Sequence, residues 1–396
     1  MTVARGLLAV LGAAACGSSI PALPSRGGPA WSEVKSEHFT LWTDAPVAQG
    51  HLLVRKMEHH RQVILRAMND ATSSAHAFVI ALGSAREVNV YLPNDVIASA
   101  WPAGGPTREA GVVLDAYTRD NDHVFSHELS HVISFGLIAH QPHWLSEGIA
   151  TYFEMAELDP SSTSTQIGVP REDRARYLRG RPAVPIHDLF ACREHSCMDG
   201  AFYATSWAVV SYLLNQHFDE LGRYFQLLNS LPRERIDEAW PSAFPHLSPN
   251  RLDRELREWL VSGTVRLPRI EVAVTDLPTT ERPLGDADAL AVRALLQLMF
   301  TPDLGKAHDL LGQALARDRT HVLARLVEAA LPRVVTPAEA QAVVDAHPDD
   351  WRAWWLLALA TPRGATRRAV VDHLCTITHE ERELCAHRDQ PPQSTP

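Results

Sequence analysis

The spacing of apolar residues predicts the secondary structure of the first half of the chain. Apolar and polar residues alternate in a way typical of strands in three segments: 38–43, 87–92 and 111–116. Apolar residues recur at helical spacing in three others: 51–68, about 142–158 and 201–217. This order of elements predicts an α+β domain that has a small mixed sheet and then helices.

The pattern changes beyond about residue 265. Residues 266–283 are rich in proline and irregular, so we expect a linker there, and 284–388 should form an all-α region. Two segments of that region, 305–318 and 337–350, look alike, because each ends in a polar turn that another apolar helix follows. Paired helices of this kind resemble tetratricopeptide-type repeats, and an ordinary helical bundle fits nearly as well.

Composition narrows the class of protein. The chain has 396 residues, of which 45% are hydrophobic and 21% charged, as in a folded soluble protein. The formal net charge of −10 is spread without a dominant block, so nucleic acid is not an expected partner.

The amino terminus has the layout of an export signal. One positive charge at Arg5 precedes a short apolar run and then small residues and Cys16. The run is too short to span a bilayer, which needs about 20 residues. It resembles a bacterial lipoprotein signal over residues 1–16, which implies a lipid anchor on Cys16 in the cell envelope, facing the periplasm or the outer surface. A signal that is simply cleaved and a short buried helix are the alternatives.

Composition predicts where the folded part of the chain begins and ends. Residues 17–30 are rich in Gly, Pro and Ser and should form a tether, so the fold should begin near Trp31. The first domain would then cover 31–265, and residues 389–396 should be a disordered tail.

Four cysteines remain besides Cys16. Cys192 and Cys197 flank a short loop, and Cys375 and Cys385 lie near the end. Two local disulfides are the simplest pairing and imply an oxidising compartment. Four reduced thiols in a cytosolic protein are the alternative.

The segment 125–135 contains the spacing His-Glu-x-x-His at His127, Glu128 and His131. Residues four apart lie on one face of a helix, so both imidazoles can bind one ion while the glutamate acts as a base. A chance match in a chain with 20 histidines has odds of about a few per cent. Three polar residues before the motif are candidate helix caps: Asp120, Asn121 and Asp122.

The next predicted helix offers a third ligand. Pro142 can start this helix, which places the carboxylate of Glu147 after the motif. Two histidines, one carboxylate and one open position make a catalytic zinc site. His140 and His143 are rival ligands.

These residues resemble a known group of enzymes. His-Glu-x-x-His followed by Trp-Leu-Ser-Glu-Gly-Ile-Ala at 144–150 resembles the gluzincin metallopeptidases, especially the peptidase MA-like domains related to the aminopeptidase-N family. The resemblance covers roughly 31–230 and implies a zincin-like domain with His127, His131 and Glu147 as zinc ligands. It also aligns Gly111–Asp115 with the edge strand that pairs with a peptide substrate, whereas an interior strand fits equally well.

Two further residues gain candidate roles. Glu154 lies seven positions after Glu147 on the same helical face, so it could hydrogen-bond a histidine ligand, or it is a solvated residue at a helix end. Tyr203 resembles the tyrosine that stabilises the oxyanion in aminopeptidase-N relatives, and a core tyrosine is the alternative.

The sequence thus predicts an exported zinc peptidase in which a zinc-activated water attacks the peptide bond and Glu128 is the general base. An endopeptidase is favoured, because the segment that captures a substrate's free amine in aminopeptidases is not visible. The alternative is a catalytically silent zinc-domain lipoprotein whose helical repeats bind a protein partner.

Overall fold

The structure is a computed structural model of the whole chain. It describes residues 20–69, 76–92, 96, 98–117, 122–157, 159, 161–180, 184–263, 265–273, 277–332, 334–378 and 385.

Strands from both halves of the chain form a six-stranded mixed sheet in the order β4-β5-β3-β2-β1-β8. Its strands are β1 (Trp31–Lys35), β2 (Phe39–Thr43), β3 (Ala77–Leu82), β4 (Ala98–Trp101), β5 (Ala110–Asp115) and β8 (Thr280–Leu284). The three central strands β2, β3 and β5 run parallel, whereas β4, β1 and β8 pair antiparallel with their neighbours. A second, two-stranded sheet joins β6 (Ser164–Gln166) to β7 (Arg269–Glu271).

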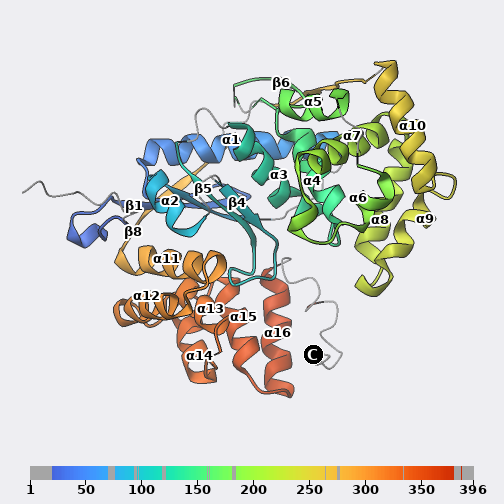
Figure 1. The fold of residues 1–396 in the computed structure, drawn as a ribbon. Coiled ribbons are helices and arrows are strands. Elements are labelled where there is room, and N and C mark those ends of the chain that lie inside the picture. The colour runs from blue at the N-terminus through green and yellow to red at the C-terminus, as the bar shows by residue number, and fades with distance from the viewer. Residues whose placement is uncertain are drawn as a thin grey trace, which may run out of the picture.

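Helices cover both faces of the large sheet (Figure 1). Those of the first part are α1 (Val47–Ala67), α2 (Ala85–Tyr91), α3 (Asp122–Leu137), α4 (His143–Phe153), α5 (Glu172–Gly180), α6 (Ile186–Ala191), α7 (Gly200–Gln216), α8 (Phe218–Ser230), α9 (Ala239–Ala243) and α10 (Pro249–Ser262). Those of the last part are α11 (Asp286–Phe300), α12 (Leu304–Arg317), α13 (Val322–Ala329), α14 (Pro337–Ala346), α15 (Trp351–Ala360) and α16 (Ala365–Ile377).

The two faces of strand β3 pack against different groups of helices. Val79 and Ala81 belong to the core that α1 and α3 cover, whereas Phe78, Ile80 and Leu82 belong to the core beneath α11–α13. Every residue of this strand is buried, as expected for a central strand covered on both faces.

Most predicted elements of the first part are confirmed. The expected strands at 38–43 and 111–116 are β2 and β5, and the first strand, β1, begins at Trp31. The three expected helices are α1, α4 and α7. The architecture is therefore mixed α and β, with a sheet larger than expected.

The strand predicted at 87–92 is wrong, because this segment forms the short helix α2. Its buried residues are Glu87, Val88 and Tyr91, which share one helical face, and the carboxylate of Glu87 pairs with Arg293 of α11 at 2.9 Å. The strand of this region is β3, whose apolar run has no alternation to detect.

Two segments expected to be irregular carry structure. The stretch 266–283 contributes β7 and most of β8, which pairs with β1, and residues 274–276 lie outside the described residues. Within the expected tether, Leu23 is buried in the core beneath α11, and the Ser25 backbone N–H donates to Asp286. The two similar segments of the last part are α12 and α14, which α13 and α15 follow.

Both expected disulfides are present, joining Cys192 to Cys197 and Cys375 to Cys385. Disulfides of this kind are typical of proteins that fold outside the cytoplasm. Within the described residues, no helix is long and apolar enough to cross a membrane. The expected signal with Cys16, the tail 389–396 and the candidate caps Asp120 and Asn121 lie outside the described residues, as does the side chain of Asp122.

Candidate metal centre

Helix α3 carries the two motif histidines. It packs against β4 and β5, against α1, and against α4 (Figure 1). Phe125, Leu129 and Val132 are buried in the core and fix one side of the helix. His127 and His131, four residues apart, therefore lie together on the side that faces α4.

Helix α4 brings the third residue, and a glycine allows it to approach α7 closely. A Cβ atom at Gly148 would lie 2.6 Å from the backbone oxygen of Ser206 and 2.6 Å from a methyl carbon of Val210, both on α7. Gly148 directly follows Glu147, so this contact holds the carboxylate of Glu147 opposite α3.

Three ligand atoms converge at this point. Nε2 of His127 lies 3.2 Å from Nε2 of His131 and 3.2 Å from Oε2 of Glu147, and the last two atoms are 3.4 Å apart. Tetrahedral zinc with bonds of about 2.0–2.1 Å needs ligand atoms about 3.3–3.4 Å apart. The three side chains are thus positioned to bind a metal ion, and their spacing fits zinc.

The far nitrogens of both imidazoles are already engaged. Nδ1 of His127 lies 3.3 Å from Oε2 of Glu154, and Nδ1 of His131 lies 3.0 Å from the hydroxyl of Ser146. Glu154 is 2% exposed, so this carboxylate is held in the interior beside the imidazole. With the protons on Nδ1, both Nε2 atoms and the carboxylate oxygen are acceptors that face one another, which requires a cation between them.

The pKa shifts of His127 and Glu147 likewise favour a positive charge at this point. Burial disfavours the charged form of His127, but hydrogen bonds to Glu147 and Glu154 outweigh it and raise the pKa of His127 to about 10. Burial likewise opposes ionisation of Glu147, and the two histidines nevertheless hold its pKa well below its usual range. The site therefore stabilises positive charge, which a proton or a metal ion can supply.

Glu128 stands beside the triangle and is fixed by the sheet. Its Oε2 accepts a hydrogen bond of 2.8 Å from the backbone N–H of Ala100 in β4. Its negative charge contributes to the raised pKa of both His127 and Tyr203, so the carboxylate faces the metal centre.

Tyr203 lies in the first turn of α7, and its ring faces the metal centre. Its ring centroid lies 6.3 Å from that of His127. Burial, together with the charges of Glu147 and Glu128, raises the pKa of Tyr203 to about 12, although Arg174 above the ring opposes this. The phenol is therefore a hydrogen-bond donor at neutral pH.

Only some of the predicted metal ligands come together in the structure. Among the described residues, His127, His131 and Glu147 form the one group suited to a metal, and His140 and His143 do not join it. Strand β5, with Gly111–Asp115, is interior, and β4 is the edge strand beside Glu128.

Sequence reasoning missed three contributors: the Ser146 hydroxyl, the Ala100 N–H and Arg174. Ser146 directly precedes Glu147, so its place next to a predicted ligand was a usable signal. Ala100 contributes only its backbone, and no residue pattern marks Arg174.

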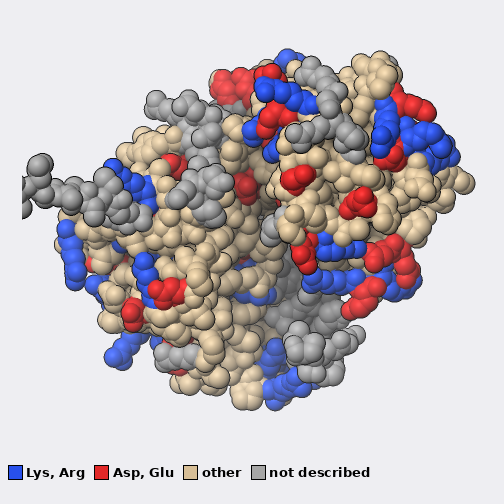
Figure 2. Space-filling view, in the orientation of Figure 1, with Lys and Arg blue, Asp and Glu red and all other residues tan. Residues whose placement is uncertain are grey.

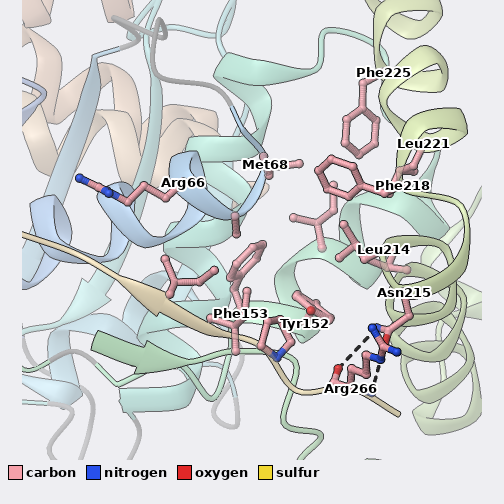
Figure 3. Close-up of a pocket in the computed structure, with 16 residues that line it drawn as sticks. Arg66, Met68, Tyr152, Phe153, Leu214, Asn215, Phe218, Leu221, Phe225 and Arg266 are labelled. Atoms are coloured by element: carbon pink, nitrogen blue, oxygen red, sulfur yellow. Dashed lines mark hydrogen bonds between the residues drawn. The ribbon is translucent and has the colours of Figure 1, made fainter. Parts of the chain in front are cut away.

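A separate apolar cavity lies on the opposite side of α4 (Figure 3). Its volume is about 310 Å³, and its α4 wall consists of Ile149, Tyr152 and Phe153, which face away from Glu147. Ends of α1, α7 and α8 close it through Met68, Leu214, Phe218 and other side chains. No metal-centre residue lines this cavity, so it is distinct from the candidate site.

Comparison with known protein families finds a match to the part of the chain that contains the centre. A family model described as "Protein of unknown function (DUF1570)" matches residues 123–233, just over a quarter of the chain. The matched stretch begins within α3 and contains the ligand triangle, Glu128, Glu154 and Tyr203. No curated protein matches the chain.

Proposed function

We propose that the protein is a zinc peptidase that acts outside the cytoplasm and is attached to the cell envelope through Cys16. The observation that carries the proposal is the ligand triangle of His127, His131 and Glu147 with the carboxylate of Glu128 beside it. Two histidines and one carboxylate leave a fourth position open on zinc, which is the arrangement of catalytic sites rather than structural ones. The resemblance of the two motif segments to gluzincins supports the same class.

The residues of the site have distinct tasks. Zinc held by the three ligands would supply a Lewis acid for the scissile carbonyl and for water. Glu128 accepts the proton of the attacking water and passes it to the leaving amine. Its contact with the Ala100 N–H fixes one carboxylate oxygen and leaves the other for this transfer. Tyr203 donates a hydrogen bond to the developing oxyanion.

The edge of the sheet suits an extended substrate. Strand β4 has β5 on one side, and no described strand pairs with its other side. An open strand edge binds a peptide through main-chain hydrogen bonds. Since Ala100 of β4 also holds Glu128, a peptide along this edge would pass the general base. An endopeptidase is favoured, because the segment that captures a substrate's free amine in aminopeptidases is not visible in the sequence.

The test compares the purified protein with its Glu128→Gln variant on a diverse peptide mixture, with metal content measured by elemental mass spectrometry. We expect about one zinc per chain in both proteins, and cleavage that falls by a factor of about 10² to 10⁴ in the variant. Equal cleavage by both proteins would contradict the proposal. Zinc in both without any cleavage would favour the alternative, a silent domain serving a partner of the tetratricopeptide-like helices.

A further inference from the structure

Helix α5 brings a basic residue to the metal centre. The helix packs against the start of α7, and the approach is close, because a Cβ at Gly200 would lie 2.5 Å from the Tyr177 ring. One turn before Tyr177, the guanidinium carbon of Arg174 lies 4.7 Å from the ring centroid of Tyr203. The packing of α5 on α7 thus fixes Arg174 over the tyrosine that faces the ligands.

Both acidic residues of α5, Glu172 and Asp173, have arginine partners in the structure. Arg171 binds Asp173 at 3.0 Å, and Arg176 binds Glu172 at 3.0 Å. Both acidic residues of the helix are therefore engaged with arginines other than Arg174. Figure 2 shows acidic and basic side chains mixed at the top of the face, where Figure 1 places α5.

Arg174 itself has no anionic partner within the described part of the chain, and its buried Nε atom has no hydrogen bond there. A guanidinium offers five N–H donors, and stacking on Tyr203 holds those of Arg174 in place. An immobilised arginine with free donors is suited to bind a carboxylate through two parallel hydrogen bonds.

The position of Arg174 limits where that carboxylate can be. The Tyr203 ring lies 6.3 Å from the His127 ring, and the Arg174 guanidinium carbon lies 4.7 Å from the Tyr203 ring. End to end, these separations place Arg174 within about 11 Å of the His127 ring, which is the length of about three extended residues.

We propose that Arg174 determines specificity by binding a carboxylate of the peptide substrate about one to three residues from the cleaved bond. This inference rests on the proposed peptidase function. The carboxylate is either an Asp or Glu side chain or the carboxyl terminus of the peptide, and the chemistry that Arg174 recognises is the same in both cases.

The test measures binding separately from cleavage. Three fluorescent peptides of one neutral sequence are compared: one amidated, one with a free carboxyl terminus, and one amidated with an internal Glu. Binding to zinc-loaded protein is measured by fluorescence polarisation in the Glu128→Gln background, so that the peptides stay intact. The variants are Arg174→Gln, Arg174→Lys and the control Arg176→Gln, which removes an exposed arginine of the same helix that is paired with Glu172.

We expect a carboxylate-bearing peptide to bind about ten- to a hundredfold more tightly than the neutral one, the range for hydrogen bonds to charged groups. Arg174→Gln should remove this preference, so that all three peptides bind with similar affinity, and Arg176→Gln should retain it. Arg174→Lys should keep part of the preference, because lysine retains the positive charge but lacks the paired N–H donors of arginine. The peptide that is preferred identifies the source of the carboxylate.

Equal or undetectable binding of all three peptides by the parent would overturn the inference, as would a preference that survives Arg174→Gln. Zinc content and thermal unfolding of each variant establish that it is folded. Cleavage of the same peptides by protein with Glu128 intact separates the two proposals. If the peptides are cleaved without a carboxylate preference, only the proposed role of Arg174 is contradicted. If binding depends on Arg174 but no peptide is cleaved, only the proposed peptidase activity is contradicted.

Discussion

At the scale of single residues, the carboxylate of Glu154 orients the imidazole of His127 by contacting Nδ1, the nitrogen that points away from the other two ligands. The 3.3 Å contact to Nδ1 holds a proton on that nitrogen and aims Nε2 at the other ligands. We expect Glu154→Gln to weaken zinc affinity about 10- to 100-fold, the usual effect of losing such a partner. Competition with a fluorescent zinc chelator would measure the change.

Glu157→Gln is the matched control for this change. Glu157 lies three residues further along the chain and is exposed, so the zinc affinity of this variant should equal that of the parent protein. Unchanged affinity in Glu154→Gln would mean that Glu154 is only a buried residue at the end of α4.

His60 gives a prediction about pH. It is fully buried on α1, and its Nε2 lies 2.9 Å from the Ser130 hydroxyl. Burial lowers the pKa of His60 to about 3, and the unfolded value is about 6.5. Between these values the unfolded chain binds a proton that the folded protein does not. Stability therefore falls as the pH falls, by about 1.4 kcal/mol per pH unit from this residue.

Urea unfolding at pH 7.5 and pH 5.0 tests this. The loss of unfolding free energy between the two pH values should be about 2 kcal/mol smaller in His60→Gln than in the parent, because glutamine does not titrate. Equal losses in both proteins would show that His60 is protonated in the folded state.

At the scale of elements, the contact of α4 with α7 positions Glu147. Gly148→Ala would put a methyl group 2.6 Å from the Ser206 backbone oxygen, so the helices must separate. We expect a loss of about 1–3 kcal/mol in unfolding free energy, together with weaker zinc binding as Glu147 moves away from α3. Calorimetric unfolding and the chelator competition measure the two effects.

Gly222→Ala on α8 is the control. A Cβ there meets nothing within 4 Å, so this change should stabilise the protein by about 0.4–1 kcal/mol and leave zinc binding unchanged. If both substitutions had the same effect, close packing at Gly148 would not be what holds Glu147.

Elements whose pattern is local could be predicted from the sequence. Amphipathic helices and the His127 and His131 pair need only spacing along one helix, and Glu147 needs only the next helix. Strand β3 and helix α2 were missed because their patterns depend on distant partners. The apolar run of β3 reflects helices on both of its faces, and Glu87 is buried only because Arg293 reaches it. Arg174 is similar, since its role exists only once α5 packs on α7.

At the scale of the whole molecule, the last part of the chain completes the fold of the first. Trp31, Trp42 and Phe78 of the sheet form one core with α11–α13, and β8 extends the same sheet. Removing the helices would expose this face, and a large exposed apolar patch favours association. We therefore expect the metal domain and the helical region to unfold in one cooperative transition.

The buried pair of Arg293 and Glu87 joins these two parts. Its atoms are 2.9 Å apart, and the side chains are 4% and 0% exposed. Arg293→Met would leave the carboxylate of Glu87 buried without its partner, which should cost about 3–5 kcal/mol. The double change Arg293→Met with Glu87→Leu should recover most of this, because no uncompensated charge remains.

The measurement is urea unfolding followed by both tryptophan fluorescence and helical circular dichroism. Arg282→Gln is the control, because its pair with Glu33 also links the late chain to β1 but Arg282 is 52% exposed, so the cost should stay below about 1 kcal/mol. If the two signals separated in the parent, or if Arg293→Met cost no more than Arg282→Gln, the helical region would be an independent unit. Coincident transitions that move together in Arg293→Met would mean that changes in the helices reach the sheet that holds Glu128.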